Sequence, residues 1–282
     1  IQNARLYQRL EQAYVRDRRI AETLQQVLLS DVPPSSPGLE IGHTYRAALD
    51  EAVVGGDFYD VFNLENEKVA LVIGDVSGKG LLAAVQTARV KFGLRAFASD
   101  DPRPDQVVRR LHQSIVQQGN YEGFVTLFFA VFDPNTGILE YANSGHEPPL
   151  LQRREGDVEW LARTGTVLGL DLPNSMEFGL ETRRIGAGDH LVLYTDGLTE
   201  ARQNGRFLGR DGLQAVWTKV SHLPSDRAAN ELYDSIQRFA KGRLTDDVAI
   251  LVVKFRPFEP LDRPPPGSLP LRNDILAKVR NS

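Results

Sequence analysis

The chain has 282 residues, of which 41% are apolar and 25% are charged; its net charge is −4 and it contains no cysteine. This length and apolar content predict one large hydrophobic core, or a domain with an extension. The mildly acidic balance argues against nucleic-acid binding, and the longest apolar run, Phe124 to Phe132, is too short to span a bilayer. The lack of cysteine excludes disulfides and thiol-based catalysis, and it suits the reducing cytoplasm, where we expect the protein to be located.

Residues 1–32 are predicted to form one long helix, because apolar residues recur at alternating steps of four and three, the spacing of a heptad seam. The seam positions are Leu6, Leu10, Ala13, Asp17, Ile20, Leu24 and Val27. Two interpretations stay open. Residues 1–28 form a homodimeric coiled coil or a stalk from an upstream domain, or the helix, above all from residue 20 to 28, packs on its own domain. Because the chain begins with Ile1 rather than Met, we expect it to be cut from a longer protein.

A linker from Pro33 to Gly38 ends this helix, and a domain of strands and helices follows over residues 39–256. The predicted strands are Leu39–Arg46, Gly56–Phe62, Val69–Asp75, Phe124–Phe132, Ile138–Ala142, Leu150–Gln152, Val158–Leu161, Phe178–Ile185, His190–Thr195 and Val248–Phe255. The predicted helices are Leu81–Ser99, Asp105–Gln118, Gly212–Val220 and Asp226–Lys241. This order does not alternate strand with helix, so it predicts an α+β fold. Residues 257–282 are predicted to be a proline-rich tail or linker.

Acidic residues stand at the ends of four predicted core strands. They are Asp57, Asp75, Asp196 and the pair Asp246 and Asp247, each beside a glycine or a small polar residue. One such acid alone is more often a helix cap, but four such sites are better explained by a fold that brings them together. Crowded carboxylates repel one another, so the cluster needs divalent cations, and an all-oxygen ligand set favours Mg²⁺ or Mn²⁺.

Five motifs carry a resemblance to a known family. They are Gly55-Gly-Asp-Phe-Tyr-Asp60, Ile73-Gly-Asp-Val-Ser-Gly-Lys-Gly80, Tyr141-Ala-Asn-Ser-Gly-His-Glu-Pro-Pro-Leu150, Tyr194-Thr-Asp-Gly-Leu-Thr-Glu200 and Thr245-Asp-Asp-Val-Ala-Ile-Leu251. In order and spacing they resemble the bacterial metal-dependent serine/threonine protein phosphatases of the sporulation stage II E type, in the PPM superfamily. The resemblance implies a four-layer α-β-β-α sandwich of two antiparallel sheets flanked by helix pairs, with metals at one end. The first seven residues also resemble the last helix of GAF sensor domains, which implies an upstream sensor domain.

The same resemblance assigns the acids to two Mn²⁺ or Mg²⁺ ions. Asp75 would bridge the ions, with the backbone carbonyl of Val76 on the same site. Asp57 would complete one ion, and Asp196 with Asp246 the other. Asp247 is the alternative to its neighbour, and the sequence leaves open which of the two ligates. Catalysis would then proceed through Asp57, Asp75, Asp196 and Asp246, which hold the ions and the water activated between them.

Three other polar residues of the motifs invite functional roles. Asp60 lies three residues beyond Asp57, so on a strand it faces the opposite way, which favours a structural role. His146 is interpreted as a residue that shapes its loop rather than as a catalytic acid. The spacing of glycines around Lys79 does not fit a phosphate-binding P-loop, which excludes a nucleotide-binding interpretation.

The resemblance implies that the substrate is phosphoserine or phosphothreonine on a regulatory protein, of the anti-sigma factor antagonist type. The alternative is a catalytically inactive pseudophosphatase that acts as a scaffold. No residue of the sequence stands out as the one that positions the substrate phosphate.

Overall fold

The computed structural model describes residues 32–33, 36–46, 55–117, 119, 123–170, 177–242, 244 and 246–258, with eight isolated residues between positions 7 and 23. Those eight are helical and exposed. Most of the predicted heptad seam, including Asp17, and nearly all of the proline-rich tail lie outside the described residues. The interpretations of both terminal segments therefore stay predictions.

Two five-stranded sheets form the centre of the fold, and all neighbouring strands in them are antiparallel. Sheet 1 has the order β1 (Leu39–Arg46), β12 (Val248–Phe255), β9 (His190–Tyr194), β6 (Leu150–Gln152) and β7 (Val158–Trp160). Sheet 2 has the order β2 (Asp57–Asn63), β3 (Val69–Val76), β4 (Val125–Asp133), β5 (Ile138–Ser144) and β8 (Glu181–Arg184). Each sheet combines strands that are far apart in the sequence, so the fold depends on non-local pairing.

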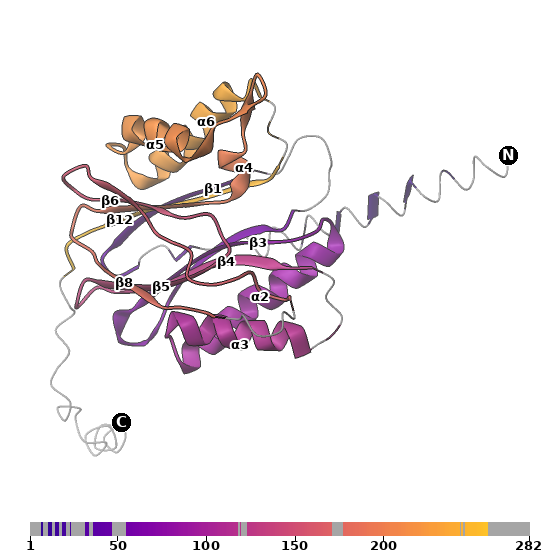
Figure 1. The fold of residues 1–282 in the computed structure, drawn as a ribbon, viewed down its shortest axis with the longest axis horizontal. Coiled ribbons are helices and arrows are strands. Elements are labelled where there is room, and N and C mark those ends of the chain that lie inside the picture. Colours follow the sequence, from indigo (N-terminus) through magenta and orange to yellow (C-terminus); the bar gives the residue numbers. More distant parts are fainter. Residues whose placement is uncertain are drawn as a thin grey trace, which may run out of the picture.

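A pair of helices covers the outer face of each sheet, as Figure 1 shows. Helices α2 (Leu81–Asp100) and α3 (Pro104–Gln117) pack on sheet 2, and α5 (Gly209–Val220) and α6 (Ser225–Phe239) pack on sheet 1. The strands supply both interfaces by alternation: in β3, Leu71 and Ile73 face the other sheet while Ala70 and Val72 face the helices. The predicted α-β-β-α sandwich is confirmed.

The register of sheet 2 places particular polar residues side by side at one end of the sandwich. Asp57 on β2 is paired with Asp75 on β3, and Asp75 is paired in turn with Thr126 on β4. All three belong to the alternating set that faces sheet 1. The core between the sheets therefore ends in polar side chains at this end.

Several boundaries differ from the predicted ones. The predicted strand from Phe178 to Ile185 is shorter, because Phe178 and Gly179 bond to the loop at Thr164 and Gly165 instead of to β5. Helix α5 begins three residues before the predicted start at Gly212. Three short elements were not predicted: the 3₁₀ turn Glu65–Glu67, the one-turn helix α4 (Asp196–Thr199), and the hairpin of β10 (Arg202–Gln203) and β11 (Arg206–Phe207).

None of the helices in the described part of the chain has a stretch long and apolar enough to cross a membrane.

Candidate metal centre

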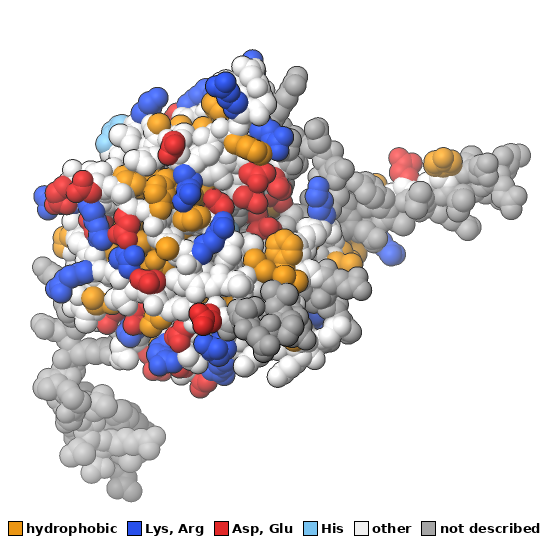
Figure 2. All heavy atoms as spheres, in the orientation of Figure 1, with side chains coloured by type: hydrophobic (Ala, Val, Ile, Leu, Met, Phe, Trp, Pro, Cys, Tyr) orange, Lys and Arg blue, Asp and Glu red, His pale blue; other side chains and the backbone are white. Residues whose placement is uncertain are grey.

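The acidic residues predicted from the sequence converge at one end of the sandwich, at the mouth between the two sheets. Sheet 2 contributes Asp57 and Asp75, which lie opposite each other on β2 and β3. Sheet 1 contributes Asp196, the first residue of α4 after β9, and Asp246 and Asp247 just before β12. In the space-filling view, acidic side chains gather where Figure 1 draws α4 (Figure 2). The four sites identified from separate motifs thus form one cluster.

Two glycines of the first motif allow the backbone to approach these acids. A Cβ at Gly56 would overlap the carbonyl oxygen of Val76 and would lie 2.7 Å from Oδ1 of Asp75. A Cβ at Gly55 would overlap Oδ2 of Asp247. Any larger residue at either position would push an acidic residue of the cluster aside. The Gly55-Gly56 pair therefore allows the start of β2, the end of β3 and the start of β12 to pack closely against one another.

The electrostatics of the cluster confirm how close the acids are. Burial, followed by the negative charges of Asp196, Asp246 and Asp247, raises the pKa of Asp75 to about 7. The pKa of Asp57 is also raised well above its usual range; burial is the largest cause and the negative charge of Asp75 is the second. Acids of both sheets thus act on one another across the mouth of the sandwich.

A second group of acids surrounds Asp196. Burial, followed by the negative charges of Asp246, Glu200 and Glu147, raises the pKa of Asp196 to about 6. No lysine or arginine of the described residues is among the main groups that shift the pKa of Asp57, Asp75 or Asp196. The groups that shift these three pKa values most strongly, apart from burial, are therefore other acids.

Thr195 was missed in the sequence analysis although it stands inside the fourth motif. It is fully buried, its hydroxyl accepts a hydrogen bond from the backbone N–H of Ala249 (2.9 Å) and it bonds to the carboxyl of Asp57. One threonine thus ties β9 and β12 of sheet 1 to an acid of sheet 2. Thr195 continues the alternating set of Leu191 and Leu193, which faces sheet 2. This alternation is the signal in the sequence that could have identified Thr195.

The residues fit a pair of hard divalent cations by their donor chemistry. Oδ2 of Asp57 is buried without a hydrogen-bond partner in the described part of the chain. Every atom that could ligate a metal ion in this cluster is an oxygen. Among the described residues, no three His, Asp or Glu side chains yet converge closely enough to enclose an ion.

The positions of Asp246 and Asp247 differ within the cluster. Asp246 is exposed, and its Oδ1 accepts a hydrogen bond from the backbone N–H of Asp247 (2.9 Å). The side chain of Asp247 is buried against Gly55. Both act on Asp75, so the choice between them as metal ligand stays open, and the predicted preference for Asp246 stays a prediction.

Asp60 lies on the opposite face of β2, as its spacing from Asp57 predicts. It is buried and accepts two hydrogen bonds from Arg95 of α2, from Nε at 2.8 Å and from Nη2 at 2.7 Å. Nζ of Lys91 lies 3.8 Å from the same carboxylate and donates a hydrogen bond to the carbonyl of Tyr59. Asp60 therefore anchors α2 to sheet 2 and is not part of the cluster.

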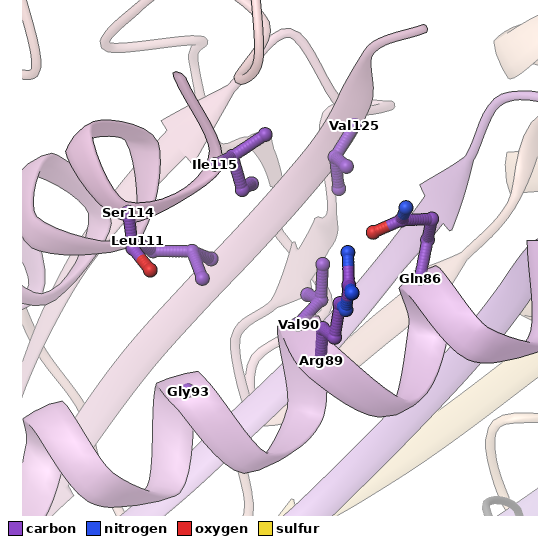
Figure 3. A pocket seen from close by; sticks show the side chains of 8 residues that line it. All are labelled: Gln86, Arg89, Val90, Gly93, Leu111, Ser114, Ile115 and Val125. Atoms are coloured by element: carbon purple, nitrogen blue, oxygen red, sulfur yellow. The ribbon is translucent and has the colours of Figure 1, made fainter. Parts of the chain in front are cut away.

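A cavity of about 150 Å³ opens between α2 and α3, on the side of sheet 2 that faces away from the acids (Figure 3). Its lining includes Gln86, Arg89, Ser114 and Val125, and no carboxylate. Val125 belongs to the alternating set of β4 that packs on the helices. The cavity is thus separate from the candidate metal centre.

Comparison with known proteins identifies relatives of this fold and sequence. The chain is 27% identical to the phosphoserine phosphatase RsbU of Bacillus subtilis, over 87% of this chain and 72% of that protein. It is 30% identical to protein IcfG of Synechocystis, over 81% of this chain but only 40% of that protein.

Among solved structures, the SiaA PP2C domain of Pseudomonas aeruginosa superposes with a TM-score of 0.74 at 16% identity, covering 88% of this chain and 97% of that domain. The catalytic domain of the serine/threonine phosphatase PstP, solved with two manganese ions, superposes with a TM-score of 0.55 at 18% identity, over 77% and 98% of the two chains.

The family profile of stage II sporulation protein E matches residues 65–256, which is more than half of the chain. Four of the five motifs lie inside this range, and the first lies just before it. The family predicted from the motifs is thereby confirmed. The chain belongs to the stage II sporulation protein E (SpoIIE) family.

Proposed function

We propose that this chain hydrolyses phosphoserine or phosphothreonine on a regulatory protein, with two Mn²⁺ or Mg²⁺ ions held by the acids at the mouth of the sandwich. The observation that carries the proposal is the convergence of Asp57, Asp75, Asp196, Asp246 and Asp247, whose charges raise the pKa values of Asp57, Asp75 and Asp196. A protein gains nothing in stability from such a cluster, because buried carboxylates that repel one another are unfavourable. Its retention is explained by ions that bind there.

The residues that would hold the ions are Asp75 and Asp57 on sheet 2, and Asp196 with Asp246 or Asp247 on sheet 1. The carbonyl of Val76, which lies against Gly56, is one further oxygen donor at this place. Bound divalent cations lower the pKa of water and neutralise the charge of phosphoryl oxygens, which is the chemistry that phosphate ester hydrolysis needs. Thr195 orients Asp57, and the two glycines let the backbone pack directly against the acids.

A protein nucleophile is not needed for this reaction, and the chain has no cysteine to supply one. The substrate class is supported by the name of one relative, a phosphoserine phosphatase, and by the PP2C domains among the structural neighbours. We propose an anti-sigma factor antagonist as the type of regulatory protein, which the resemblance of the five motifs implies and which the similarity to RsbU supports. The scaffold interpretation is not favoured, since all predicted acids are in place.

The test is hydrolysis of p-nitrophenyl phosphate, and of a panel of serine-phosphorylated antagonist proteins, by the purified chain with added Mn²⁺. We expect turnover that EDTA abolishes and that Mn²⁺ or Mg²⁺ restores. Treatment with iodoacetamide serves as the matched control and should leave turnover unchanged. Hydrolysis that persists in EDTA would refute the metal-dependent mechanism. Hydrolysis of p-nitrophenyl phosphate without hydrolysis of any antagonist would refute the substrate assignment alone.

A further inference from the structure

The buried imidazole of His146 lies between the two sheets, next to the strand ends that carry the acids. It follows a tight turn after β5 that the residues Asn143 and Gly145 build. Oδ1 of Asn143 accepts a hydrogen bond from the backbone N–H of His146 (3.0 Å). Gly145 has a φ of +70°, and a Cβ there would overlap the side chain of Val167, so this position requires glycine. The turn directs the imidazole inward, where its exposed fraction is only 2%.

The two ring nitrogens of His146 contact different sheets. Nδ1 lies 2.9 Å from Oγ1 of Thr126, on β4 of sheet 2. Nε2 lies 3.2 Å from the carbonyl oxygen of Tyr194, at the end of β9 in sheet 1. Thr126 is the cross-strand partner of Asp75, and Tyr194 stands two residues before Asp196. One imidazole therefore joins the strand ends that carry acids of both sheets.

The chemistry of these two partners fixes the tautomer of the ring. A carbonyl oxygen can only accept, so Nε2 carries the proton and donates it to Tyr194. Nδ1 is then unprotonated and accepts, so the hydroxyl of Thr126 must donate to it. Burial lowers the pKa of His146 to about 3, which keeps the ring neutral and is consistent with this pattern.

The consequence concerns Thr126. Because its only proton is bound to His146, its oxygen presents lone pairs alone to the face it shares with Asp75. A free hydroxyl there could donate to the Asp75 carboxylate and stabilise it without a cation. A hydroxyl fixed as an acceptor cannot do this, but it can accept a hydrogen bond from water around a bound cation.

We propose that His146 is a positioning residue of the metal centre, which holds Thr126 as an acceptor beside Asp75 and holds the end of β9 at a fixed distance from β4. This inference rests on the proposed function and adds two residues to it that hold the site without themselves binding the ions. A bland alternative is that the contacts only stabilise the fold. Measuring the affinity for Mn²⁺ distinguishes the positioning role from a purely structural one, because a purely structural contact leaves this affinity unchanged in the folded protein.

The experiment compares Thr126→Val, which removes the hydroxyl at nearly constant shape, with Thr126→Ser, which keeps it. Thr87→Val is the matched control, since Thr87 is also buried but its hydroxyl donates to the carbonyl of Ala83 within its own helix. His146→Gln adds a second arm: its amide can still donate toward Tyr194 but frees the hydroxyl of Thr126. For each purified protein, Mn²⁺ affinity is measured by titration calorimetry, folding by circular dichroism, and half-saturating Mn²⁺ by turnover of p-nitrophenyl phosphate.

We expect Thr126→Val and His146→Gln to bind Mn²⁺ about tenfold more weakly than the wild type, the loss typical of residues that orient metal ligands. Thr126→Ser and Thr87→Val should bind as the wild type does. Mn²⁺ affinity within twofold of the wild type in a folded Thr126→Val protein would overturn the inference, even if His146→Gln failed to fold. A wild type that binds no Mn²⁺ would instead refute the proposed function, and this inference with it. A wild type that binds Mn²⁺ while Thr126→Val is unaffected refutes the inference only.

Discussion

Replacing Asp75 by asparagine should abolish phosphatase activity and at the same time stabilise the metal-free protein. The carboxyl of Asp75 is largely buried and faces Asp196, Asp246 and Asp247, so its ionised form is unfavourable in the folded state. Its pKa rises from 3.8 to about 7 on folding. In the unfolded chain the same group ionises freely. Asparagine has nearly the same shape and no charge, so it removes this penalty together with the central metal ligand.

The size and sign of the effect follow from proton linkage. An acid whose pKa is raised on folding contributes its full stability below pH 3.8 and loses it as the pH rises toward about 7. A shift of about three pKa units corresponds to at most ~4 kcal/mol above pH 7, at 1.36 kcal/mol per unit. For a domain of this size, a gain of ~2–4 kcal/mol raises the melting temperature by roughly 4–16 °C. The gain should be largest at pH 8 and fall to less than half of that value at pH 5, where ~1.6 kcal/mol of the penalty remains.

The assay is thermal unfolding of wild type and Asp75→Asn in EDTA at pH 5 and pH 8, followed by circular dichroism, with turnover in Mn²⁺ measured alongside. The expected result is a variant without turnover that melts higher than the wild type at pH 8 in EDTA. Added Mn²⁺ should raise the melting temperature of the wild type but not that of the variant. An inactive variant that melts lower than the wild type at pH 8 would refute the electrostatic reasoning, and near-normal turnover would refute the central role of Asp75.

Two further predictions use other acids of the chain. Asp60→Asn should destabilise the fold by ~3–5 kcal/mol, because it leaves the buried cation of Lys91 and the guanidinium of Arg95 without their carboxylate. Its turnover per folded molecule should stay far above that of Asp57→Asn. Denaturant titration and Mn²⁺-dependent turnover check this, and the reverse order of activities would refute the assignment of the two faces of β2. If Asp17 lies on the heptad seam, Asp17→Leu should tighten a coiled-coil dimer through residues 1–28 and change basal activity. Analytical sedimentation of the wild type and the variant measures the dimer, and turnover is measured alongside. A wild type that is monomeric at tens of micromolar, with turnover unchanged in the variant, would exclude the coiled coil.

The sequence predicted best what depends on local alternation and apolar content. Strands β3, β4 and β12 were predicted because both of their faces are buried, so each reads as a continuous apolar run. The same period-two reasoning separated Asp57 from Asp60 correctly. The family and the fold were confirmed, and with them the enzyme class of a phosphatase. Strand β8 was placed poorly because all but one of its residues are exposed, so no apolar pattern marks its start.

What the sequence could not predict is the relation between strands that are distant in the chain. Thr126 became part of the site only through the register of β4 on β3, and Thr195 only through the stacking of sheet 1 on sheet 2. His146 was interpreted as a residue that shapes its loop, and this stays a prediction; its imidazole contacts Thr126 and Tyr194. Its two partners, however, lie 20 and 48 residues away along the chain. No local pattern encodes such pairings, because they arise only when both sheets have formed.

The position of the acids explains why metal binding and the packing of the two sheets should depend on each other. The apolar core between the sheets ends at a mouth where Asp57 and Asp75 of sheet 2 face Asp196, Asp246 and Asp247 of sheet 1. Without cations the ionised acids of the two sets repel one another, which opposes the packing of the sheets at this end. The neutral links made by His146 and Thr195 oppose that repulsion. Any ion that binds both sets draws the sheets together there. A displacement of β4 or β9 of a fraction of an ångström is therefore expected to change the affinity for the metal before it changes the rest of the fold.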